Sequence, residues 1–141
     1  MADTDASHIA SSELGWVADI EQVTLGNQNF RTVLYTGAHT QLTVMRLQAG
    51  EEIGWESHSH LDQFVRIEAG EARLDLGRDG GHVDEAHPVT DDWALIVPAG
   101  IWHNITNTGS TDLLLYSLYS PPEHAAGTVH ATKSDADADE H

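Results

Sequence analysis

The feature that most constrains the fold of this sequence is a series of short segments in which apolar and polar residues alternate. β-Branched and aromatic residues are frequent in them, and glycine or proline stands close after most, as is typical of strands and turns. The best helical stretch, residues 13–23, contains a glycine and two valines, which disfavour a helix. The sequence therefore predicts an all-β protein, built as an antiparallel sandwich or barrel. The expected strands are residues 30–35, 41–47, 63–69, 71–76, 93–97, 101–106 and 112–119.

The length of 141 residues suits one domain with a single hydrophobic core. Residues 1–13 are small and polar, and residues 134–141 alternate acidic residues with alanine. Both ends are therefore predicted to be flexible tails around one domain at residues 14–133. Cysteine is absent, which excludes a disulfide framework and a thiolate metal site.

The charge of the chain is strongly negative. Lys and Arg total 6 against 23 Asp and Glu, a formal net charge of −17. Without a basic patch, binding to nucleic acid or to an anionic membrane is disfavoured. The first residues lack the basic and apolar pattern of a secretory signal, and no apolar run is long enough to span a membrane, so we expect a cytoplasmic protein. The acidity serves either solubility or a cytoplasm of high salt concentration, and composition leaves both open.

The most informative side chains are three histidines and a glutamine. His58 and His60 are two residues apart, so in a strand both imidazoles would face one side. Gln63 would share that face if residues 61–62 form a turn, and His103 follows a second turn much later. These four neutral ligands would hold a divalent zinc, nickel, manganese or iron ion better than magnesium or calcium. They would leave the full charge of the ion to attract an anionic ligand.

The segment around His58 carries a family resemblance. It reads His58-Ser-His60, two residues, Gln63, six residues and Gly70. This is similar to the first motif of the cupin superfamily, which is Gly, five residues, His-x-His, three or four residues, Glu, six residues, Gly. Gln63 replaces the usual glutamate, the spacer before it is one residue short, and Glu52 stands where the first glycine is expected.

The later segment resembles the second cupin motif, Gly, five residues, Pro-x-Gly-x-x-His, three residues, Asn. Here it reads Asp92, five residues, Pro98-Ala-Gly100-Ile-Trp-His103, three residues, Asn107, so that only the first glycine differs. Residues 19–133 as a whole resemble a compact subfamily of single-domain prokaryotic cupins. The resemblance implies a double-stranded β-helix, a jelly-roll-like barrel, and a homodimer, because small cupins are commonly dimers.

The resemblance also implies a function. A metal-binding cupin would act on a small oxygenated substrate, such as a sugar, a sugar acid or a related carbonyl compound. Isomerase or lyase chemistry fits most metals, and dioxygenation fits iron. A non-catalytic module that binds a small ligand or a metal is the alternative, and a structural barrel with a vestigial site is a third interpretation.

Catalysis would also need side chains beside the metal, and several positions are candidates. Arg46 lies in an otherwise apolar strand and would grip a carboxylate or phosphate if it pointed inward, which the alternation does not decide. Tyr35, His39 and Tyr116 are the other main candidates. The wider set contains Trp55, Glu56, Trp102, Tyr119 and His124.

Overall fold

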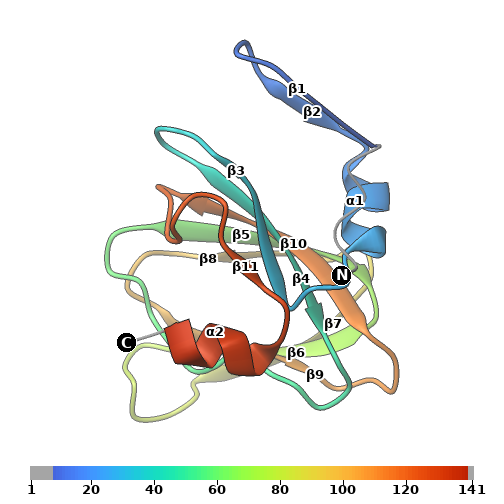
Figure 1. The fold of residues 1–141 in the computed structure, drawn as a ribbon. Coiled ribbons are helices and arrows are strands. Elements are labelled where there is room, and N and C mark those ends of the chain that lie inside the picture. The colour runs from blue at the N-terminus through green and yellow to red at the C-terminus, as the bar shows by residue number, and fades with distance from the viewer. Residues whose placement is uncertain (1–7, 140–141) are drawn as a thin grey trace.

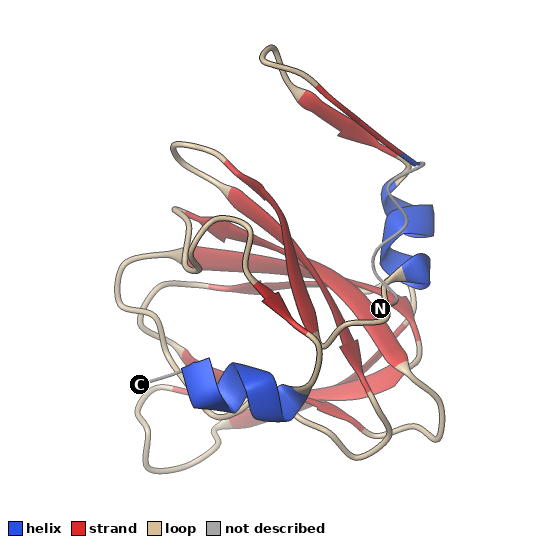
Figure 2. Ribbon diagram, in the orientation of Figure 1, coloured by secondary structure: helices blue, strands red, loops and turns tan. Residues whose placement is uncertain are grey.

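The computed structural model describes residues 8–139 and is built mainly of antiparallel β-strands (Figures 1 and 2). The larger sheet has the order β11-β3-β4-β10-β5-β8, and a three-stranded sheet has the order β7-β6-β9. The all-β double-stranded β-helix is thereby confirmed. Each of the expected strands appears within one residue of its predicted bounds. The strands of the two sheets are β3 (Arg31–Thr36), β4 (Gln41–Leu47), β5 (Asp62–Ala69), β6 (Glu71–Gly77), β7 (Glu85–Thr90), β8 (Ala94–Val97), β9 (Trp102–Asn107), β10 (Leu113–Ser120) and β11 (Val129–His130).

The interior of the barrel has an apolar half and a polar half. On β10, Leu115 pairs with Met45 on one side and Ile67 on the other, and all three side chains are fully buried. Four residues further along β10, Tyr119 pairs with Gln41 and Gln63, so polar side chains line the interior there. Burying polar groups costs free energy unless they find partners. The polar half is therefore where a ligand site is expected.

A short helix, α1 (Ile20–Gly26), contacts β4, β5 and β10 of the larger sheet. The Asp19 side chain caps it by accepting a hydrogen bond from the backbone N–H of Gln22 at 3.3 Å, and Val23 and Thr24 are buried. No helix was expected here. The sequence signal is weak because a helix of seven residues shows less than two full turns of its apolar side.

Both ends of the described chain differ from the predicted tails. Residues 9–11 form β1 (Ile9–Ser11), which pairs with β2 (Trp16–Ala18) in a hairpin that projects from the barrel (Figure 1). Residues 133–139 form α2 (Lys133–Asp139), whose Ala136 packs in the core with Phe30. The rest of the expected tails, residues 1–7 and 140–141, lies outside the described residues. Within residues 8–139, no helix has the length and apolar character needed to cross a membrane.

Candidate metal centre

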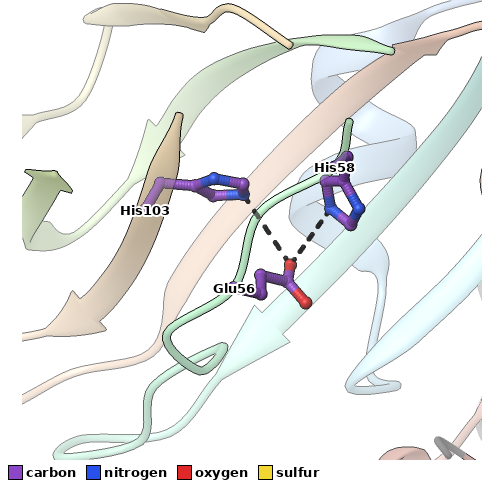
Figure 3. A group of neighbouring side chains, drawn as sticks. All are labelled: Glu56, His58 and His103. Atoms are coloured by element: carbon purple, nitrogen blue, oxygen red, sulfur yellow. Dashed lines mark ion pairs between the residues drawn. The ribbon is translucent and has the colours of Figure 1, made fainter. Parts of the chain in front are cut away.

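The centre is formed by the loop before β5 and by the start of β9. Glu56 and His103 form an isolated β-bridge in which the N–H of Glu56 donates to the carbonyl of His103 at 3.0 Å, and the N–H of His103 donates back at 2.8 Å. This bridge aligns the two side chains on the inner side of the barrel. His58 lies two residues after Glu56, and its ring turns toward the same point (Figure 3).

The three side chains are close enough to share one ion. Glu56 Oε2 lies 3.4 Å from His58 Nε2 and 3.7 Å from His103 Nε2 (Figure 3). One ligand atom from each residue lies within 4.8 Å of the other two. The cluster can therefore hold a metal ion.

The other two expected ligands lie in different surroundings. His60 is exposed in a turn, because residues 57–61 form a loop and strand alternation does not apply there. The expectation that His58 and His60 face one side of a strand is thereby corrected. Gln63 begins the inward alternation of β5, is only 3% exposed, and has no hydrogen-bond partner for its Oε1 among the described residues.

The position of Glu56 also explains the departures from the first motif. Shifted by two residues, the motif reads Gly50, five residues, Glu56-Ser-His58, four residues, Gln63, six residues and Gly70. Gly50 and Gly70 both have a positive φ, of 83° and 102°, which favours glycine. In this register the first glycine is present and the spacer has its usual length. The sequence thus also contained a signal for Glu56 as a candidate ligand in place of the first histidine.

The hydrogen bonds around the centre leave the lone pair of His103 Nε2 available to bind a metal ion. His103 Nδ1 lies 3.0 Å from the carbonyl of Ile101 and donates to it, so its Nε2 carries the lone pair. Burial lowers the pKa of His103, which keeps the ring neutral at pH 7. His58 Nδ1 lies 3.5 Å from Glu123 Oε2, which holds the ring from its other side.

Glu56 supplies the negative charge of the centre. Burial opposes its ionisation, but the hydrogen bond from His58 and the positive charge of Arg31 are among the effects that outweigh burial, so its pKa lies below the usual value. Glu56 is therefore a carboxylate at neutral pH.

The donor set fits a divalent transition metal. His103 Nε2 and Gln63 Oε1 are buried without a hydrogen-bond partner in the described part of the chain, and such atoms usually have one. Two imidazoles, a carboxylate and an amide oxygen are ligands that manganese, iron, nickel and zinc accept. The set carries one negative charge, whereas the sequence-based set of four neutral ligands carried none.

The main catalytic candidates from the sequence lie away from the centre. Arg46 pairs with Leu114 on the outer side of the sheet, and its Nε lies 3.8 Å from Asp112 Oδ2. Tyr35 and His39 are exposed, and Tyr116 packs on the outer side of the sheet against Phe64. Strand alternation in the sequence did not decide whether the side chain of Arg46 points inward. The pairing of β4 with β10 decides that it points outward.

Besides Glu56, which belongs to the centre, two members of the wider set and one residue outside it lie near it. The ring of Tyr119 is centred 6.2 Å from that of His58 and 5.2 Å from that of His124. Arg31, at the start of β3, is 9% exposed and lines a pocket with His124. Sequence reasoning missed Arg31, although Val33, on the same side of the strand, marked that side as buried.

Comparisons with known proteins agree with this geometry. The family model described as the cupin domain matches residues 43–119, more than half of the chain. The chain is 50% identical over 125 residues to the uncharacterized protein YrkC of Bacillus subtilis (strain 168), covering 89% of this chain and 67% of YrkC. It is 37% identical over 122 residues to the uncharacterized protein L612 of Acanthamoeba polyphaga mimivirus, covering 86% and 74% of the two chains.

A solved crystal structure is also similar to this chain. The crystal structure of BH2720 from Bacillus halodurans is similar with a TM-score of 0.86 and 48% identity, over 86% of this chain and 92% of that one. The resemblance seen in the two motifs is thereby confirmed over the barrel as a whole. The chain belongs to the cupin domain family.

Proposed function

We propose that this cupin binds one divalent transition metal ion through Glu56, His58, Gln63 and His103 and acts on a small oxygenated substrate. The observation that carries the proposal is the cluster of Glu56, His58 and His103, whose ligand atoms lie within 4.8 Å of one another. The buried, unpartnered oxygen of Gln63 supports a fourth ligand, because it occupies the glutamate position of the motif. Sugars, sugar acids and related carbonyl compounds are the substrate class.

A bound ion would supply a Lewis acid, and redox chemistry as well if it is iron, so metal identity separates isomerase or lyase activity from oxygenase activity. The centre retains one net positive charge after Glu56 is counted. It therefore favours a substrate oxygen that carries, or develops, negative charge.

The side chains next to the centre have distinct protonation states. Burial raises the pKa of Tyr119 to about 12, so its hydroxyl keeps its proton and serves as a donor. Burial lowers the pKa of His124 to about 4, so its ring is neutral at pH 7. His124 Nε2 is buried with no hydrogen-bond partner among the described residues. A protonated hydroxyl and a neutral imidazole can orient an oxygenated substrate through hydrogen bonds.

Elemental analysis tests the proposal. The protein is purified without chelators and without a histidine tag, stripped, and reloaded separately with manganese, iron(II), nickel and zinc. We expect about one ion per chain, lost in a His58→Ala, His103→Ala double variant that keeps its circular dichroism spectrum. A His82→Ala, His87→Ala variant is the matched control, because these two histidines lie on the surface beside acidic residues. Equal metal content in all three proteins, or none in any, contradicts the proposal.

Turnover then separates the enzyme from a non-catalytic binding module. The loaded protein is screened with sugars, sugar acids and oxo acids, with the double variant as the blank. A module would bind a ligand without converting it, and the double variant would then match the wild type in every reaction.

We also propose the homodimer expected for a small cupin. β8 ends the larger sheet, and its Ile96 is exposed, as are Leu14 and Val17 near the projecting hairpin. Unpaired sheet edges and exposed apolar residues are commonly covered by a partner. Sedimentation of the wild type, and of an Ile96→Asp variant expected to be monomeric, tests this.

A further inference from the structure

A second polar pocket lies beside the metal centre. It has a volume of about 250 Å³, and its lining includes Arg31, Glu123, His124, His130 and Asp139. Glu123 connects it with the centre, because its Oε2 lies 3.5 Å from Nδ1 of the ligand His58. His124 makes a second connection through the ring of Tyr119. The pocket is therefore placed to hold the part of a substrate that does not reach the metal.

The pocket contains a buried cation, Arg31, whose guanidinium is hydrogen-bonded to the imidazole of His130. Arg31 Nη1 donates to His130 Nδ1 at 3.2 Å, and His130 Nε2 lies 2.9 Å from Asp139 Oδ2. Since a guanidinium group can only donate, Nδ1 of His130 must be the acceptor, and Nε2–H donates to Asp139. The chain Asp139–His130–Arg31 thus joins α2, β11 and β3 and fixes the guanidinium at one side of the pocket.

The positive charge of Arg31 has no carboxylate partner in the described part of the chain. No ion pair joins Arg31 to a carboxylate there, although its charge lowers the pKa of Glu56, and its buried Nε has no hydrogen-bond partner among the described residues. The two acids of the pocket are engaged elsewhere, Glu123 with His58 and Asp139 with His130. A guanidinium that is more than nine-tenths buried is costly unless an anion neutralises it.

We propose that Arg31 binds the carboxylate of the substrate, whose other oxygen atoms reach the metal centre. This inference rests on the proposed function, and it narrows the substrate class from oxygenated molecules to small oxo or hydroxy acids. Arginine suits the role because its planar donors match the two oxygens of a carboxylate. The local charges balance, since a divalent ion and Arg31 are offset by Glu56, Glu123 and Asp139. Glu123 and Asp139 lie 3.5 Å and 2.9 Å from histidine nitrogens, so the attraction for a substrate carboxylate comes from Arg31 and the ion themselves.

The test measures binding by the cobalt(II)-loaded protein. Pyruvate and its uncharged analogue pyruvamide are titrated separately, and the visible absorption of the cobalt follows each. We expect the wild type to bind pyruvate more tightly than pyruvamide. We expect Arg31→Gln to lose at least about tenfold in pyruvate affinity, with unchanged cobalt content and little change for pyruvamide. The matched control is Arg46→Gln, a strand arginine on the outer side of the barrel, which should bind like the wild type.

Arg31 also joins α2 to the barrel, so the variant must be shown to fold. Circular dichroism melts are recorded for each protein, and Arg31→Lys, which keeps the charge but not the planar fork, serves if Arg31→Gln is unfolded. Arg31→Lys should retain part of the preference for pyruvate. Equal pyruvate affinity in wild type and Arg31 variants, no preference for pyruvate over pyruvamide, or no pyruvate binding by the wild type overturns the inference. Failure of the proposed function is distinguishable, because the wild type would then bind no cobalt.

Discussion

The sharpest test of the centre compares Glu56→Gln with His60→Ala. Glutamine keeps the size of Glu56 and removes its charge, whereas alanine removes the imidazole of an exposed residue. The motif register first read from the sequence makes His60 a ligand and Glu56 a neighbour. The structure places Glu56 between the two imidazoles and leaves His60 in a turn. The two variants therefore give opposite results under the two arrangements.

The expected size of the effect follows from these distances. Glu56 Oε2 lies 3.4 Å and 3.7 Å from the two imidazole nitrogens, so an ion bound by both rings would also be held by the carboxylate. Changes to residues that only orient a ligand cost about 10- to 100-fold in metal affinity. Loss of a charged ligand should cost at least about 100-fold, or about 2.7 kcal/mol. His60→Ala should change the affinity by less than about twofold, or about 0.4 kcal/mol.

The assay is competition of the stripped proteins with a chromophoric zinc chelator at pH 7, where His103 is neutral and Glu56 ionised. Thermal melts of the metal-free proteins show that each variant is folded. A large loss of affinity in His60→Ala with none in Glu56→Gln would refute the centre described here and restore the His-x-His pair.

Three further predictions test the fold and the interior. Gly70→Ala should lower the free energy of unfolding by about 2–4 kcal/mol in urea titrations, because the new Cβ at φ +102° would lie 2.9 Å from the carbonyl oxygen of Asp112. Gly109→Ala, with ordinary contacts of 3.5 Å or more and no positive φ, is the control, and equal losses would contradict the reasoning. The pKa of His124, lowered to about 4 chiefly by burial, predicts a pH-dependent stability. Below pH 6.5 the unfolded chain takes up a proton that the folded protein does not, so stability falls from about pH 6.5 to about pH 4, by up to ~3 kcal/mol. This loss should be absent in metal-free His124→Gln, and an identical pH profile in both proteins would refute the shift. Gln63→Leu removes a buried oxygen that has no partner among the described residues, so the metal-free protein should unfold within about 1 kcal/mol of the wild type or be more stable. Calorimetric titration with zinc should show weaker binding by this variant, and unchanged binding would remove Gln63 from the ligand set.

Much of the barrel was predictable because strand alternation is a local property of the chain. The strands from β3 to β6 and from β8 to β10 follow from apolar residues at every second position between turns. β7 was missed because it contains Pro88 and is largely exposed, which removes the alternation. α2 was missed for the opposite reason. Its sequence is polar, and only its buried Ala136 joins the core cluster, which also contains Phe30, more than 100 residues earlier.

The candidate site was likewise predictable from the sequence only in part. The sequence alone predicted the barrel, the second motif with His103, and a set of candidate ligands near residue 60. It offered two registers of the first motif, because Glu56, His58 and His60 all stand two residues apart, and the spacing from Gly50 to Gln63 favoured the one with Glu56. The bridge between Glu56 and His103 made that choice, and it joins segments 47 residues apart.

Only the tertiary structure could reveal Arg31. Its charge becomes significant because His130, 99 residues later, and Asp139 hold it at a pocket beside His58. A strand pattern shows which side of a residue is buried, but it does not show which distant groups share that interior. Convergence of side chains depends on how loops and chain ends close the barrel, and that is decided by packing across the whole chain.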